Sequence, residues 1–233
     1  MNILRMIFFA TYKSFLCCKP FTSLKNLPMQ KQIPLKLEYV NESIYAGFFK
    51  RLASLLLDGL ILAPLTVLTV VINSYGLKNF YYTLIPNLLV GLWYMVYLVK
   101  KNGGTPGKRI MGLKILKTDA TEIGWKEAML RHSLSFLFSV LMMIAMVVSL
   151  TKADETYYLS LGWLKKQEYL QSLSPLLFML ATWINNGWFY GELIILLTND
   201  RKRAAHDFIA GTVIVQDIYI DRIREVMSKE GSV

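Results

Sequence analysis

Apolar residues gather in four blocks along the chain, and each block is long enough to cross a bilayer as a helix. The blocks cover about residues 52–72, 82–99, 133–150 and 176–197. A transmembrane helix needs about 20 mostly apolar residues, because each residue advances about 1.5 Å through a hydrocarbon layer about 30 Å thick. The pattern therefore predicts four transmembrane helices and an all-α integral membrane protein.

Two short runs of a different kind lie outside these blocks. Residues 110–116 alternate apolar and polar side chains, and residues 212–217 are rich in β-branched residues. Such runs are typical of strands. Both lie on the same side of the predicted membrane, and pairing them would satisfy backbone groups that a lone strand leaves exposed. We therefore expect a minor β pairing beside the helices.

The distribution of Lys and Arg between the blocks predicts the orientation. Residues 1–51, 100–132 and 198–233 hold 22 of the 26 basic residues, and the two remaining loops hold four. Loops that carry an excess of Lys and Arg stay on the cytoplasmic side. Both termini, the middle loop and the β pairing are therefore predicted to be cytoplasmic. This asymmetry also explains the net charge of +10 without a nucleic-acid partner.

The composition argues against a soluble enzyme. Apolar residues make up 54% of the chain before glycine is counted, whereas a soluble domain has roughly 45–50% with glycine included. His132 and His206 lack a metal-ligand spacing, and Cys17 and Cys18 have no second Cys or His pair. A nucleophile motif such as G-x-S-x-G is also missing. We predict no enzymatic activity, no cofactor and no metal site.

The segments on either side of the blocks are predicted to be cytoplasmic. Residues 1–37 contain six basic and no acidic side chains, and such a segment is attracted to anionic lipid. We expect residues 1–45 to form a basic arm at the cytoplasmic face of the lipid bilayer. Residues 46–218 would form the membrane domain, and residues 219–233 would form a cytoplasmic tail.

Three motifs around the blocks resemble the RDD family of bacterial membrane proteins. They are KRLASLLLDG at 50–59, GGTPGKRIMGLKIL at 103–116 and RAAHDFIAGTVIV at 203–215. The arginine and the two aspartates that characterise the family correspond to Arg51, Asp58 and Asp207. The resemblance implies a multi-pass protein of the bacterial cytoplasmic (inner) membrane. It implies little about activity, since most members have no assigned function and some are proposed to move ions, including sodium/proton exchange.

Two acidic residues are predicted at similar depth inside the membrane. Asp58 lies six residues after Leu52, which places it roughly 9 Å below the cytoplasmic edge of the hydrocarbon. Glu192 lies at a comparable depth in the fourth block. An ionised aspartate there costs about 2.5–3.5 kcal/mol unless it is paired or hydrated. One interpretation is a hydrated ion or proton site formed by Asp58, Glu192 and one or both of Asn185 and Asn186.

A second interpretation of the same residues is structural. Arg51 would reach between Asp58 and Asp207 and tie the first span to the cytoplasmic C-terminal segment through charge-assisted hydrogen bonds. Both interpretations are open at the level of the sequence.

These features favour two functions. The first is transport of a small cation or solute, with proton coupling at Asp58 as its specific form. The second is a membrane adaptor or assembly protein whose basic arm and C-terminal helix, about residues 218–229, recruit a cytoplasmic partner. Four helices leave little room for an enclosed transport path, and a homo-oligomer would supply that room.

Overall fold

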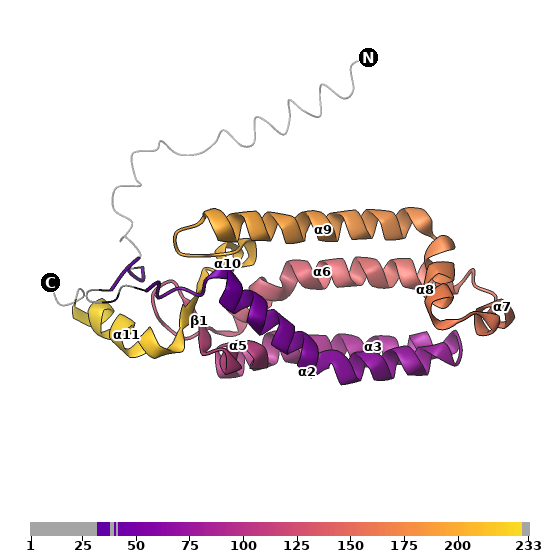
Figure 1. The fold of residues 1–233 in the computed structure, drawn as a ribbon, viewed down its shortest axis with the longest axis horizontal. Helices are drawn as coiled ribbons and strands as arrows, with labels where there is room; N and C mark the ends of the chain where they lie inside the picture. Colours follow the sequence, from indigo (N-terminus) through magenta and orange to yellow (C-terminus); the bar gives the residue numbers. More distant parts are fainter. Residues whose placement is uncertain (1–31, 38–39, 41, 230–233) are drawn as a thin grey trace, which may run out of the picture. The chain divides into compact units, whose positions relative to one another are not determined.

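The computed structural model describes residues 32–37, 40 and 42–229. These residues belong to one compact unit that begins at Gln32. They are mostly helical, as Figure 1 shows, and they include one two-stranded sheet. The prediction of a helical protein with a minor β pairing is therefore confirmed. Most of the predicted basic arm, together with Cys17 and Cys18, lies outside the described residues.

Four long helices account for most of the described chain. They are α2 (Phe48–Ser74), α3 (Lys78–Leu92), α6 (Trp125–Leu150) and α9 (Pro175–Thr198). Helix α3 continues without a break through the π-helical turn η2 (Trp93–Tyr97) and helix α4 (Leu98–Asn102). Helix α6 packs against η2 on one side and against α9 on another, while α2 packs against α3.

Three membrane spans are supported by both length and composition. Within the described part of the chain, these candidates are Phe48–Ser74, Lys78–Ile110 and Trp125–Leu150. Helix α9 is comparable in length but carries Asn185, Asn186 and Glu192 between its apolar ends. The first three predicted spans are thus matched by apolar helices, and a membrane crossing by the fourth is not established.

The third span begins earlier than hydropathy predicts. The third block was predicted to begin at about residue 133, but α6 runs continuously from Trp125. At its N-terminus, the Glu127 carboxylate accepts a hydrogen bond of 2.8 Å from the Gly124 N–H. This contact satisfies a donor that the helix leaves free, which stabilises a start at this point.

The two strands are antiparallel and join the loops that follow the second and fourth long helices. Strand β1 (Leu113–Lys117) pairs with β2 (Thr212–Gln216), with Ile115 opposite Ile214. The prediction placed the first strand at 110–116, but its first residues belong to the short helix α5 (Pro106–Ile110) and a turn. Pro106 at the first helical position favours this helix, because its ring presets the helical φ.

The structure contains two similar units that are not visible as a sequence repeat. Helix α5 is followed by Gly112 and β1, and helix α10 (Ala205–Ile209) is followed by Gly211 and β2. Both glycines have positive φ, +65° and +63°, a conformation that carries little steric cost only for glycine. Each unit therefore turns a short helix directly into a strand, and the sheet joins the two units.

Further helices cover the two ends of the bundle. At the sheet end, α11 (Ile220–Lys229) buries Ile220, Ile223 and Met227 in a cluster with β2. At the opposite end, α7 (Glu155–Ser160) and α8 (Trp163–Ser172) contribute to a buried cluster with the ends of α3 and α6. Figure 1 shows these two groups at opposite ends of the long helices.

Candidate functional site

Asp58 is held in a cage of hydrogen-bond donors at one end of the bundle. Its side chain, on α2, is only 3% exposed. Oδ1 accepts hydrogen bonds of 2.6 Å from Tyr94 Oη and 2.7 Å from the Gly107 N–H, and Oδ2 accepts one of 2.6 Å from Thr105 Oγ1. The Lys108 ammonium lies 3.9 Å from Oδ2. These contacts solvate the carboxylate with protein groups in place of water.

Local sequence explains how this cage forms. Gly103 has φ of +69° and ends α4, and the chain then enters α5, where the Gly107 N–H donates to Asp58 on α2. At Gly107, a Cβ would lie 2.3 Å from Ser54 O and 2.7 Å from Asp58 Oδ1. Only glycine permits this approach, so the motif at 103–107 allows α5 to pack directly on Asp58.

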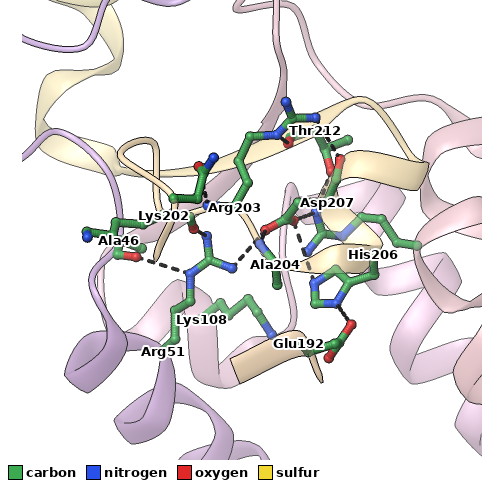
Figure 2. Close-up of polar contacts among 12 residues, drawn as sticks. Ala46, Arg51, Lys108, Glu192, Lys202, Arg203, Ala204, His206, Asp207 and Thr212 are labelled. Atoms are coloured by element: carbon green, nitrogen blue, oxygen red, sulfur yellow. Dashed lines mark hydrogen bonds and ion pairs between the residues drawn. The ribbon is translucent and has the colours of Figure 1, made fainter. Parts of the chain in front are cut away.

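Asp207 lies in a second cluster and joins two arginines from different helices. Its side chain is fully buried on α10. Oδ2 accepts a 2.8 Å hydrogen bond from Arg51 Nη1 and one of 3.0 Å from the Ala204 N–H. Arg131, on α6, donates to Oδ1. Figure 2 shows Arg51 and Ala204 directed toward the Asp207 carboxylate.

The two arginines extend the cluster to neighbouring elements. Arg51 also donates to Ala46 O at 3.1 Å and to Lys202 O, and Arg131 donates to Thr212 Oγ1. Burial alone would raise the pKa of Asp207, but the positive charges of Arg131 and Arg51 outweigh burial and hold that pKa below its ordinary value. Asp207 is therefore ionised at neutral pH, and its pairs tie α2 and α6 to α10.

Glu192 has a partner of its own. Its carboxylate on α9 contacts His206 Nδ1, and His206 Nε2 lies 3.6 Å from Asp207 Oδ1. A pocket of about 200 Å³ opens beside this pair, between α2 and α9. Arg51 and Lys108 face the same pocket among apolar side chains.

The structure separates the residues that the sequence grouped as an ion or proton site. Asp58 lies in the donor cage, Glu192 pairs with His206, and neither makes a hydrogen bond or ion pair with the other among the described residues. Asn185 and Asn186 are exposed on α9, and within the described part of the chain neither side chain has a hydrogen-bond partner. The structural interpretation expected Arg51 to contact both Asp58 and Asp207. Among the described residues, Arg51 contacts Asp207 and does not contact Asp58.

Sequence reasoning missed several partners in these two clusters. Arg131, Tyr94 and Thr105 were not singled out, although Thr105 lies within the motif that resembles the family. Arg131 carried a weak signal, because it is a basic residue near the start of an apolar helix, where an isolated charge needs a partner. Tyr94 carried none, since aromatic residues are common near the ends of spans.

A larger cavity, of about 600 Å³, lies between α3 and α6. Most of its lining is apolar and comes from one face of each helix. The polar side chains of the lining are Asn73, Thr83, Asn87, His132, Ser139 and Gln167. Asp58, Glu192 and Asp207 do not line this cavity.

Two pairs of polar residues join α2 and α3 beside this cavity. Thr69 Oγ1 lies 3.1 Å from Asn87 Oδ1, and Thr83 Oγ1 lies 2.9 Å from Asn73 Oδ1. In each helix the two residues are four positions apart, so both fall on one face. Each asparagine uses one end of its amide in this contact, and the other end has no hydrogen-bond partner in the described residues.

The described residues contain no group of three or more His, Cys, Asp or Glu side chains that could hold a metal ion.

Comparison with known proteins supports the resemblance seen in the sequence. The model of the RDD family matches residues 45–211, which is more than half of the chain. The match includes both clusters and the helices that line the larger cavity. No curated protein matches the chain.

Proposed function

Because this chain belongs to the RDD family, we propose that it is a membrane transport protein that moves a small solute across the bilayer. The observation that carries this proposal is the cavity of about 600 Å³ between two apolar helices that are candidate spans. Asparagine amides within a span are costly unless they are paired or functional. Here two such amides face a cavity large enough for a small molecule.

The proposal includes α9 as a fourth span. Its 24 residues would extend about 36 Å, which exceeds the hydrocarbon thickness of about 30 Å. It packs along α6, which is a candidate span. Four crossings place the sheet and both ends of the membrane domain on one side.

That side is proposed to be the cytoplasm of a bacterial cell, with the protein in the inner membrane. The support is the excess of basic residues in the segments that precede α2, join α4 to α6 and follow α9, which hold 22 of the 26 in the sequence and would also attract anionic lipid at this face. The short helices α7 and α8 would then face the outside.

The orientation predicts which positions a membrane-impermeant thiol reagent can reach. Lys78 and Lys165 are exposed at the α7–α8 end, whereas Asp221 is exposed on α11. In a variant with both Cys17 and Cys18 replaced by serine, Lys78→Cys and Lys165→Cys should be labelled in intact cells. Asp221→Cys should be labelled only after lysis. Labelling of Asp221→Cys in intact cells would reverse the orientation.

Filling the cavity should stop transport. A Cβ on Gly91, which lines the cavity, would meet no atom within 4 Å, so Gly91→Phe adds bulk without a backbone clash. Flux should fall at least about tenfold, which corresponds to about 1.4 kcal/mol of lost binding. Flux of protons, sodium and a small uncharged solute is measured in vesicles that contain the purified protein, against protein-free vesicles.

The matched control is Gly187→Phe on α9. A Cβ on Gly187 also meets no atom within 4 Å, and Gly187 does not line the cavity. This variant should keep wild-type flux. Equal loss in both variants would remove the cavity from the proposal, and no flux for any of the three species through folded wild-type protein would end the transport proposal.

Proton or cation coupling at Asp58 is the narrower form of this proposal. It requires the carboxylate to exchange its proton or cation with water, whereas Asp58 is 3% exposed and accepts three hydrogen bonds. The geometry therefore favours a solute path through the cavity, with Asp58 supporting the helices around it.

A second candidate is a membrane adaptor that recruits a cytoplasmic partner. It is favoured by the separate buried cluster that β1, β2 and α11 form with residues between Ile33 and Tyr45. Ile218, at the start of this C-terminal segment, is 81% exposed. Folded protein without flux would favour this alternative.

A further inference from the structure

We propose that the cavity between α3 and α6 binds an uncharged molecule with hydrogen-bonding groups, taken up from the bilayer itself. This inference rests on the proposed function for its role as a transported solute. The binding can be tested without any measurement of flux.

The first argument is the charge of the cavity. Among the residues that the structure describes, its lining contains no Asp, Glu, Lys or Arg side chain, and His132 is its only His. No ion pair of the described residues involves His132. An ion entering the cavity would lose hydration without gaining an opposite charge, and that loss is expensive in an apolar setting. An uncharged molecule does not carry this cost.

The second argument is that two asparagine amides each have one end without a hydrogen-bond partner in the described residues. Asn73 and Asn87 each bind a threonine through one end of the amide and line the cavity. The free end of an amide needs a hydrogen bond when water is excluded. The threonine and the asparagine of each helix are four residues apart. The Asn73 and Asn87 amides are therefore offset by about 6 Å along the helices. A ligand with an amide, ester or ketone group would satisfy one or both.

The third argument is the way in which the cavity is closed. At the sheet end, α6 packs against η2 and α4, and at the other end a buried cluster joins α3, α6 and α8. Between these ends the two helices are separated by the cavity. The side of such a gap faces the hydrocarbon when the helices span a bilayer. The remaining lining, which includes Phe136, Met142 and Met143, suits an apolar body.

The test uses three photoactivatable probes with the same diazirine-bearing alkyl chain. One carries a primary amide, one an ammonium and one a carboxylate. The full chain is reconstituted in phosphatidylcholine nanodiscs, irradiated with each probe, and the labelled peptides are identified by mass spectrometry. The amide probe should label the facing sides of α3 and α6 saturably. An excess of non-photoactivatable alkyl amide should suppress that labelling, and alkyl amine or fatty acid should not.

Variants separate a hydrogen-bonded ligand from lipid chains that merely fill the gap. Asn87→Leu should weaken the apparent affinity about 3- to 10-fold, the range expected for one hydrogen bond. Asn185→Leu is the matched control, since Asn185 is exposed on α9 and does not line the cavity. Gly91→Phe leaves both threonine–asparagine pairs intact and should abolish saturable labelling. This variant therefore tests the cavity even if the Asn87 variant does not fold.

Three results would overturn the inference. The first is that alkyl amine or fatty acid suppresses labelling by the amide probe as well as alkyl amide does. The second is that Asn185→Leu weakens the apparent affinity as much as Asn87→Leu does. The third is labelling that neither Asn87→Leu nor Gly91→Phe changes. The last would mean that lipid chains occupy the cavity non-specifically. Saturable amide binding without flux in vesicles would instead contradict the transport proposal and leave the binding site in place.

Discussion

Asp207→Asn is expected to destabilise the folded protein by about 3–5 kcal/mol, the usual cost of removing one partner of a buried ion pair. The carboxylate binds Arg51 and Arg131, and its side chain is fully buried. Asparagine has nearly the same shape but no charge, so two buried guanidinium groups would lose their paired carboxylate and keep hydrogen bonds only to neutral groups. The contacts that tie α2 and α6 to α10 would be lost together.

The measurement is thermal and denaturant unfolding of purified protein in detergent. Asp217→Asn is the matched control, because Asp217 pairs with Arg109 at 2.9 Å while its side chain is 40% exposed. An exposed pair contributes only about 0–1 kcal/mol. If the two variants lost similar stability, the buried cluster would not hold the helices together as proposed.

The pH dependence of this effect has a defined sign. The pKa of Asp207 is lowered in the folded state from an ordinary value of 3.8. Its contribution to stability is therefore complete above that ordinary value and is lost only as the pH falls below it. Protonation of Asp207 itself should therefore leave the stability of the protein unchanged from about pH 5 to 8, and the loss of stability that it causes should appear only at more acidic pH.

Asp58→Asn is expected to lower stability by about 1.5–3 kcal/mol, the value of one hydrogen bond to a charged group. The carboxylate oxygens face three donors, from Tyr94, Thr105 and Gly107. An asparagine can turn only one oxygen toward them, and its NH₂ group would then oppose a donor. The cage around the N-terminus of α5 would loosen, and Gly107 would no longer be held against α2.

Two measurements on the same samples separate this role from proton or cation transport. Melting temperature reports the structural role, and flux in vesicles reports transport. A carrier role predicts wild-type stability with abolished flux, and that combination would contradict the structural role. Because Arg51 does not contact Asp58, Arg51→Gln should add to the loss in Asp58→Asn and not rescue it.

Much of the fold was predictable from periodicity and hydropathy. Three of the four predicted spans match apolar helices, and the predicted strand pairing is present with a shift at residues 110–112. These features depend on local properties, since each span or strand is recognisable from its own residues. Membership of the RDD family was identified from motifs in the same way.

The partners of these residues could not be predicted, because they come from distant parts of the chain. Asp207 meets Arg51 across 156 positions and Arg131 across 76. Their contact depends on how α2, α6 and α10 are placed. Glu192 and Asp58 were grouped because their predicted depths agree. Depth gives a residue's position along the membrane normal but not its position within the membrane plane. In the structure, Glu192 contacts His206, whereas Asp58 accepts a hydrogen bond from the Gly107 N–H.

By itself, the sequence determined which segments are apolar enough to cross a membrane, about where the strands lie and which segments hold the excess of basic residues. Each of these follows from composition over a short window or from charge counts. Only the tertiary structure decided that Asp58 is enclosed by α5, that Asp207 joins two arginines, and that α3 and α6 leave a cavity between them. The physical reason is that side-chain pairing and packing gaps depend on the relative positions of whole helices, which hydropathy does not encode.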